Sequence, residues 1–295
     1  MSSKHSAAGI VIGVCGALMP AAAFAHSVAP DRSAATGWSD VFGAVLLAVV
    51  ALVYAVGQRR VTRRSGAPRE GGHVRFWLGW TALAGALGPP LDVWSSLSFA
   101  AHMTQHELMM LVAAPLLVLA RPLGTLMWGL PGRVGSALTS RSLRRMGAWL
   151  AAPMVAWLLH AFVLWGWHVP GAFEAGLRSV PIHWLQHASF FAAAVIYWWS
   201  IFSSSAGAER KGVALVSVFT TAVHTGVLGM LLTFSTQPWY PSYAHVVNTW
   251  GLTAIEDQQL GGLIMWVPGG MAFIIAALVL AAAWLKQAEM RAARG

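Results

Sequence analysis

Seven apolar segments, each long enough to form a helix that crosses a lipid bilayer, constrain the fold of this chain more than any other feature. A helix rises about 1.5 Å per residue, so about 20 apolar residues cross a hydrocarbon core of about 30 Å. The segments are residues 41–57, 76–91, 98–120, 147–167, 182–202, 213–234 and 260–285. Composition agrees, since 57% of the residues are hydrophobic and only 10% are charged. We therefore expect an all-α fold, a polytopic membrane helix bundle with about seven transmembrane helices.

The start of the chain has the pattern of a secretory signal sequence. A short polar start precedes an apolar run, and Ala23-Phe24-Ala25 forms a small-x-small cleavage site. Cleavage there would make His26 the N-terminal residue, whose amine and imidazole together suit copper(II). We expect four regions: a signal peptide at 1–25, a short outer N-terminal segment at 26–40, a seven-helix transmembrane domain at 41–286 and a cytoplasmic tail at 287–295.

The positions of the basic residues predict the orientation of the bundle. Of the 19 Lys and Arg residues, 16 fall in loops or a tail that would share one side of the membrane, whereas Arg32 and Arg178 fall on the other side and Lys4 falls in the signal. Because cytoplasmic loops are enriched in Lys and Arg, the mature N-terminus is expected outside and the C-terminus in the cytoplasm. The formal net charge of +9 then reflects topology and predicts no nucleic acid partner. Residues 121–146 mix arginines with apolar side chains, so part of this inner loop is expected along the membrane surface.

Two copies of a His-x-x-Gln-His motif stand at the start of two apolar segments. His102 and His106 form one pair, and His183 and His187 form the other. Residues four apart lie on the same face of a helix, so each pair points both imidazoles the same way. Counted along the helices, these four residues lie in the outer half of the membrane together with His160 and His168, and His224 lies slightly deeper. Polar groups within membrane helices are costly and mark functional sites, although an imidazole can also serve as an interhelical hydrogen-bond partner. The sequence alone does not determine whether the two pairs face each other.

Several other residues are candidates for a metal site. Met103 supplies a thioether, which favours copper(I), and Glu107 could orient an imidazole or relay protons. Asp92, Glu256 and Asp257 stand at outer helix ends, where a carboxylate satisfies helix N-terminal amides or attracts a cation. Cys15 is the only cysteine and falls in the signal. The chain therefore cannot form an internal disulfide and has no Cys-x-x-Cys site.

Four ordered blocks between Asp40 and Ala282 resemble the CtaG-like cytochrome c oxidase assembly factors of bacterial membranes. The blocks are His102-Met103-x-Gln105-His106 with Ala114-Pro115-Leu116-Leu117, His183-x-x-Gln186-His187 leading to Tyr197-Trp198-Trp199, His224-x-x-x-Leu228-Gly229 with Pro238-x-Tyr240-Pro241-x-Tyr243, and Asp257-Gln258-Gln259-x-Gly261-Gly262-x-x-Met265-Trp266. The resemblance implies a multi-pass protein of the bacterial plasma (inner) membrane that matures a haem-copper oxidase and takes part in copper handling. It also implies that the five motif histidines form the site. The single-span, cysteine-dependent copper-delivery factor that has shared the CtaG name is a different protein.

The leading hypothesis is a non-enzymatic assembly factor that receives copper at the outer face and helps to load an oxidase subunit. The expected ligands are His102, His106, His183, His187, His224 and Met103, with His26, His160, His168, Glu107, Asp92 and Asp257 as further candidates. The expected partners are haem-copper oxidase subunits, periplasmic copper chaperones and membrane lipid.

Two alternatives stay open at this point. One is a haem-binding electron-transfer protein, in which histidines on facing helices supply axial ligands. The other is an ion or metal transporter, in which histidines and Glu107 relay protons or ions. An enzyme is not expected, since the chain has no Gly-rich phosphate loop and no spacing that singles out a nucleophile and its base.

Overall fold

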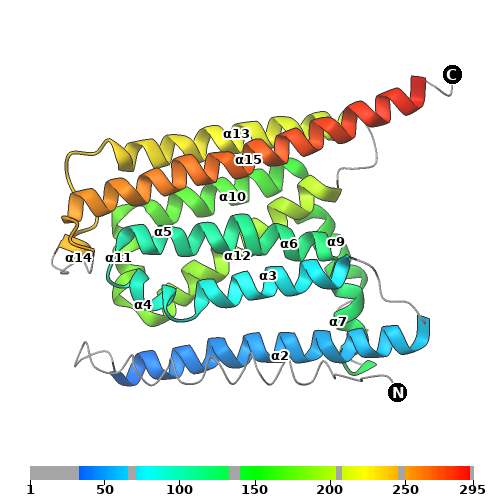
Figure 1. The fold of residues 1–295 in the computed structure, drawn as a ribbon, viewed down its shortest axis with the longest axis horizontal. Coiled ribbons are helices and arrows are strands. Elements are labelled where there is room, and N and C mark those ends of the chain that lie inside the picture. Colours follow the sequence, from blue (N-terminus) through cyan, green and yellow to red (C-terminus); the bar gives the residue numbers. More distant parts are fainter. Residues whose placement is uncertain (1–32, 66–70, 133–139, 204–207, 245–249, 293–295) are drawn as a thin grey trace, which may run out of the picture.

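The computed structural model describes residues 33–65, 71–132, 140–203, 208–244 and 250–292, and within these ranges every regular element is helical. The long helices run side by side, back and forth along one axis (Figure 1). The elements are α2 (Ser33–Ser65), α3 (Gly72–Leu87), α4 (Leu91–Ser95), α5 (Phe99–Glu107), the π-helix η3 (Leu108–Ala113), α6 (Ala114–Ala120), α7 (Leu123–Gly129), α9 (Arg141–Leu150), α10 (Pro153–His168), α11 (Pro170–Arg178), α12 (Val180–Ser203), α13 (Ala208–Thr233), α14 (Pro241–Ala244) and α15 (Ala254–Ala292).

Each of the seven expected segments is mainly helical, and the all-α membrane bundle is confirmed. Four helical stretches are long and apolar enough to cross a bilayer: Val41–Arg64, Phe99–Ala120, Lys211–Thr233 and Ala254–Met290. A fifth span would combine α9 and α10, which meet at a bend of 72°. Helix α3 has only 16 residues, and α12 carries the polar residues of its motif. Seven spans and their orientation therefore stay predictions, and the signal peptide at 1–25 and His26 lie outside the described residues.

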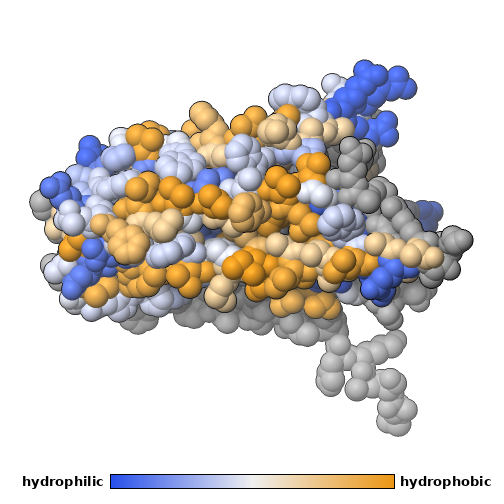
Figure 2. Space-filling model, turned by 90° about the horizontal axis from the view of Figure 1, so that it is seen from above, coloured by the Kyte–Doolittle hydropathy of each residue, from blue (hydrophilic) through white to orange (hydrophobic). Residues whose placement is uncertain are grey.

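The surface of the bundle is apolar across its middle, as lipid contact requires. Figure 2, which looks down on α13 and α15, shows hydrophobic residues across the centre of that face and hydrophilic ones toward both ends. Leu52 of α2, Phe219 of α13 and Leu278 of α15 are each more than 60% exposed. A soluble monomer rarely exposes a patch of this extent, and hydrocarbon chains would cover it here.

Small residues allow α15 to lie close to two other helices. A Cβ atom on Gly262 would lie 2.7 Å from the carbonyl oxygen of Gly229 in α13, and one on Gly261 would lie 2.4 Å from the ring of Phe99 in α5. A larger side chain would displace the α13 backbone at Gly262 and the buried Phe99 ring at Gly261. The pair Gly261-Gly262 thus serves helix packing and holds α5 next to α15.

The two carboxylates at the start of α15 act as helix caps. Asp257 accepts hydrogen bonds from the Ser98 hydroxyl (2.6 Å), the Phe99 amide (2.6 Å) and the Ala100 amide (3.3 Å), so it caps α5 from a neighbouring helix. Glu256 accepts from the Thr253 amide at 2.8 Å, while the Thr253 hydroxyl accepts from the Glu256 amide at 3.4 Å, which is a capping box. The first turn of α5, where His102 lies, is thereby fixed.

Candidate metal centre

Three histidines from the two motif copies meet in the bundle interior. We call His102 and His106 of α5 and His187 of α12 the His triad. One nitrogen from each ring lies within 4.8 Å of the others, and the three side chains are buried. The ring centroids of His106 and His187 are 5.2 Å apart, and those of His102 and His106 are 4.4 Å apart. The two motifs therefore face each other.

Contacts on the neighbouring faces of α5 and α12 set this arrangement. The indole of Trp198 in α12 donates a hydrogen bond to the Met110 carbonyl in η3 at 2.9 Å, which ties the two helices together below the triad. The helix widens into the π-helix η3 directly after the first motif, and π-helical turns occur frequently at functional sites.

The glutamines of the two motifs face neighbouring elements, and only Gln105 has hydrogen-bond partners among the described residues. Gln105 donates to the Ala86 carbonyl at 2.7 Å and to the Asp92 carboxylate at 3.1 Å, which ties α5 to the end of α3 and to α4. Burial raises the pKa of Asp92, and the hydrogen bond from Gln105 offsets only part of that effect. Gln186 packs over Gly176 of α11, where a Cβ atom would lie 3.0 Å from its amide oxygen.

A fourth imidazole lies at the margin of the triad. The ring centroid of His183 is 4.2 Å from that of His187 and 5.8 Å from that of His102. Unlike the triad, His183 is only partly buried. It is therefore the imidazole of the cluster nearest to solvent.

Tyr243 of α14 determines which nitrogen of His102 is free. Its hydroxyl donates to the Ser95 carbonyl at 2.7 Å, so its oxygen is left to accept from Nδ1 of His102 at 3.1 Å. With the proton on Nδ1, the lone pair of His102 is on Nε2, the form that binds a metal.

Several nitrogens of the cluster are buried without a hydrogen-bond partner among the described residues. They are Nε2 of His102, both ring nitrogens of His106 and Nε2 of His187. Buried polar atoms are nearly always satisfied, because an unmade hydrogen bond costs about 1–3 kcal/mol. Each neutral imidazole has one lone-pair nitrogen, so these three rings can offer three ligand atoms within 4.8 Å of one another, a set that fits a metal ion such as copper.

Two phenylalanine rings pack directly on the triad. Phe173 of α11 lies 5.1 Å from the His102 ring, and Phe190 of α12 lies 4.5 Å from the His106 ring. His168 lies behind these two phenylalanines, with centroids 6.3 and 6.0 Å away. Its Nδ1 is 2.7 Å from the Leu164 carbonyl, so Nδ1 carries the proton and Nε2 has no partner among the described residues.

The structure places His160 and His224 in a second group on α10 and α13. Their ring centroids are 6.0 Å apart, His160 packs on Tyr197, and the Trp165 indole donates to Nδ1 of His224 at 3.4 Å. The sequence predicts that His160 lies in the same half of the membrane as the motif pairs and that His224 lies slightly deeper, so depth alone did not separate these two histidines from them. Their other ring contacts are with Trp157 of α10 and Tyr197 of α12, and among the described residues no ring contact found joins them to the His triad.

The remaining candidates occupy other positions. Met103 is fully buried in the apolar core, about 100° around α5 from His102. The Glu107 carboxylate points toward α15, where a Cβ atom on Gly269 would lie 3.0 Å from its Oε2.

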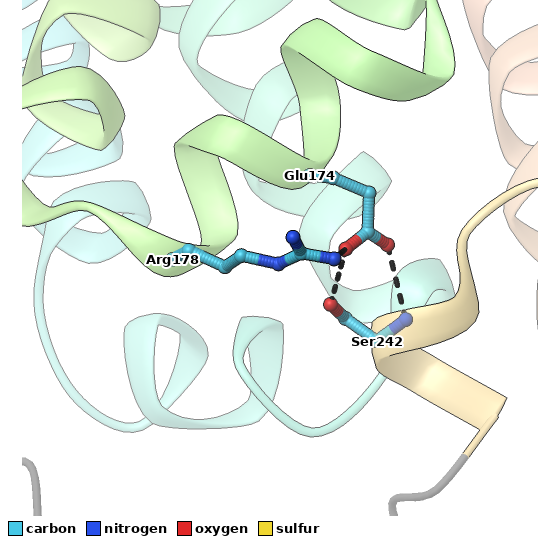
Figure 3. A network of polar contacts seen from close by, with 3 residues as sticks. All are labelled: Glu174, Arg178 and Ser242. Atoms are coloured by element: carbon cyan, nitrogen blue, oxygen red, sulfur yellow. Dashed lines mark hydrogen bonds and ion pairs between the residues drawn. The ribbon is translucent and has the colours of Figure 1, made fainter.

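Hydrogen bonds of Ser242 and Tyr240, which the sequence did not predict, fix the segment that carries Tyr243. Figure 3 shows Glu174 of α11 accepting hydrogen bonds from the Ser242 amide (3.0 Å), the Ser242 hydroxyl and the Arg178 guanidinium (2.8 Å). Burial acts to raise the pKa of Glu174, but these hydrogen bonds and the Arg178 charge outweigh it and lower the pKa. Tyr240 donates to the His168 carbonyl at 3.0 Å. The only sequence signal for these roles was the Pro-x-Tyr-Pro-x-Tyr block.

Together these features define a helical membrane protein with a buried three-histidine centre near one end of its bundle. Residues 52–287 match the family described as cytochrome c oxidase caa3 assembly factor (Caa3_CtaG), so the chain belongs to that family. Its resemblance to the CtaG-like factors is thereby confirmed.

Two curated relatives are also similar to the chain. They are the uncharacterized protein Mb0105 of Mycobacterium bovis and the uncharacterized protein MT0111 of Mycobacterium tuberculosis, each 25% identical over 258 residues. The match covers 83% of this chain but only 39% of each relative, so the chain spans about two fifths of their length. No solved structure matches the chain.

Proposed function

We propose that this protein binds copper at the His triad and passes it to a subunit of a haem-copper oxidase during assembly. The family supports the assembly role. The observation that supports copper is the convergence of three buried imidazoles, with ligand atoms within 4.8 Å of one another, from both motif copies. Imidazole is a good copper ligand.

The charge of the site favours copper(I) over divalent ions. The triad consists of neutral imidazoles and contains no carboxylate or thiolate to compensate a cation. The cost of moving an ion from water into a low-dielectric site rises with the square of its charge, so a divalent ion pays about four times the penalty of a monovalent one. Three neutral ligands thus suit a monovalent cation best.

The packing of the site favours a small ion over haem. The ring centroids of the triad lie between 4.4 and 6.0 Å apart, and Phe173 and Phe190 pack directly on two of the rings. A porphyrin would need this space between the histidines. A metal ion needs only the gap between the nitrogens.

His183 provides a route for ligand exchange. Because it is partly exposed and next to His187, it can bind the ion before another imidazole releases it. A donor or acceptor site on a partner would then meet the ion at His183. The partners in this proposal are oxidase subunits and periplasmic copper chaperones, and the location is the bacterial plasma membrane. Copper is cargo, so no catalytic step is assigned.

The test is copper(I) binding to the detergent-purified chain, measured by competition with a chromophoric chelator under reducing conditions. We expect about one tightly bound ion, which is lost when His106 and His187 are both changed to Ala. The matched control is His73→Ala, a histidine of α3 that the Tyr54 hydroxyl contacts at 2.8 Å, far along the bundle from the triad. Loss of oxidase maturation in cells should follow the same pattern. Wild-type copper binding by the double variant would overturn the proposal, and a Soret band in the purified protein would favour haem.

A further inference from the structure

Helix α9 (Arg141–Leu150) lies outside the packed bundle. None of its side chains is buried, although it forms a regular ten-residue helix. Ser140 caps its start, since the serine hydroxyl accepts from the Leu143 amide at 3.4 Å. A helix this short is marginal in water, so it needs another surface for stability.

The two sides of α9 differ in chemistry. At about 100° per residue, Arg141, Arg144 and Arg145 fall on one side, and Leu143, Met146 and Leu150 fall on the opposite side. All three arginines are exposed, as are Leu143 and Met146. The helix contains no Asp or Glu. An exposed apolar face opposite a purely basic face is typical of helices that lie in a membrane interface.

The position of α9 matches that of an interfacial helix. It meets α10 at a bend of 72°, so it lies close to the membrane plane when α10 runs across the membrane. The next helix begins with the exposed side chains Met154 and Leu158, which face lipid. In Figure 1, α9 lies at the end of the bundle where α2 ends. Basic residues gather there, including Arg64, whose guanidinium stacks over Trp128 of α7.

We propose that α9 is a binding site for anionic phospholipid. Arg141, Arg144 and Arg145 contact the phosphates of the headgroups, and Leu143, Met146 and Leu150 insert among the acyl chains. Two features favour lipid over a protein. The apolar face of α9 adjoins the lipid-exposed start of α10, and the charged side chains of α9 are all basic. The site does not depend on copper binding and would anchor the inter-helix segment before α10 to one leaflet.

The test titrates the full detergent-purified chain with phosphatidylglycerol or phosphatidylcholine and counts bound lipids by native mass spectrometry. Each basic residue near an anionic surface strengthens binding by about fivefold at low salt. We therefore expect the triple variant R141Q/R144Q/R145Q to lose tenfold or more in phosphatidylglycerol affinity and to lose the preference over phosphatidylcholine. The preference should also weaken as salt is raised, because salt screens exposed charges.

A charge-matched control is the triple variant R59Q/R63Q/K286Q, which removes three exposed basic residues from α2 and α15. It should keep at least half of the wild-type preference, and both triple variants should keep wild-type helix content and elution volume. Equal losses in the two variants would mean a general charge effect and would refute the site. Unchanged lipid binding in R141Q/R144Q/R145Q would refute it as well, and if that variant then failed to co-purify with an oxidase subunit, α9 would be a protein-docking helix instead.

Discussion

Changing Tyr243 to Phe isolates the role of one hydroxyl in the metal centre. The Phe ring keeps the contacts that Tyr243 makes with Phe99 and Phe173, whose centroids lie 6.0 and 6.3 Å away. The lost oxygen accepts from Nδ1 of His102 and donates to the Ser95 carbonyl. Without it, His102 either buries an unpaired N–H or moves its proton to Nε2, the nitrogen that we propose as the copper ligand.

Both consequences weaken copper binding by a similar amount. An unpaired buried donor costs about 1–3 kcal/mol. Removal of the residue that orients a histidine ligand typically costs 10–100-fold in metal affinity, which is about 1.4–2.7 kcal/mol. We therefore expect the dissociation constant for copper(I) to rise by about 10–100-fold in Tyr243→Phe, measured by chelator competition.

Tyr240→Phe is the control for this variant. Tyr240 is also buried, and its hydroxyl donates to the His168 carbonyl at 3.0 Å and not to a ring of the triad. In thermal unfolding experiments Tyr240→Phe should lose about 0.5–1.5 kcal/mol for its one hydrogen bond, and Tyr243→Phe should lose up to about twice as much for its two. Only Tyr243→Phe should lose copper affinity. Equal copper affinities in the two variants would refute the reasoning that Tyr243 orients His102.

Three further predictions concern the surroundings of the triad. Asp257→Asn should lower the free energy of unfolding by about 1.5–3 kcal/mol, because the cap of α5 loses its charge and one acceptor; an unchanged melting temperature would contradict the cap. Glu174 has a lowered pKa when folded, so its stabilising effect is complete above its ordinary pKa near 4.5 and disappears as pH falls through the folded value. The difference in melting temperature between wild type and Glu174→Gln should therefore shrink between pH 7 and pH 3, and a constant difference would argue against the ionised contact. His183→Ala should slow copper(I) transfer to an added chelator several-fold more than it weakens equilibrium binding, as stopped-flow absorbance would show; unchanged transfer rates would exclude His183 as the exchange ligand.

The amino-acid sequence was sufficient to predict the helices and the two histidine pairs. Segment length and hydrophobicity determine where membrane helices form, and the four-residue spacing places His102 and His106 on one face. The rotation of each helix about its axis depends on long-range contacts such as that between Trp198 and the Met110 carbonyl, which no local pattern encodes. For the same reason His160 and His224, at a similar depth, could not be separated from the triad.

The partner of a capping residue is equally hard to predict from local sequence. Asp257 stands in the first turn of its own helix, where a carboxylate usually caps that helix. The structure instead directs it to the amides of Phe99 and Ala100, 158 and 157 residues away. Helix ends that meet at one end of a bundle can share a cap, and this depends on how the helices pack.

The glutamine in each His-x-x-Gln-His motif couples ligand geometry to helix packing. Around the helix axis it lies to one side of both histidines, about 60° before the first and 100° before the second, so it points to the neighbouring element while they point to the histidine cluster. In α5 that element is the end of α3, whose Ala86 carbonyl accepts from Gln105, and in α12 it is α11, where Gly176 makes room for Gln186. A rotation of either helix by one residue would break this contact and would also withdraw a histidine from the triad. The spacing of the motif thus places two imidazoles on one face of each helix and links their direction to the position of the glutamine, so two short motifs suffice to bring three histidines together between helices that are otherwise apolar.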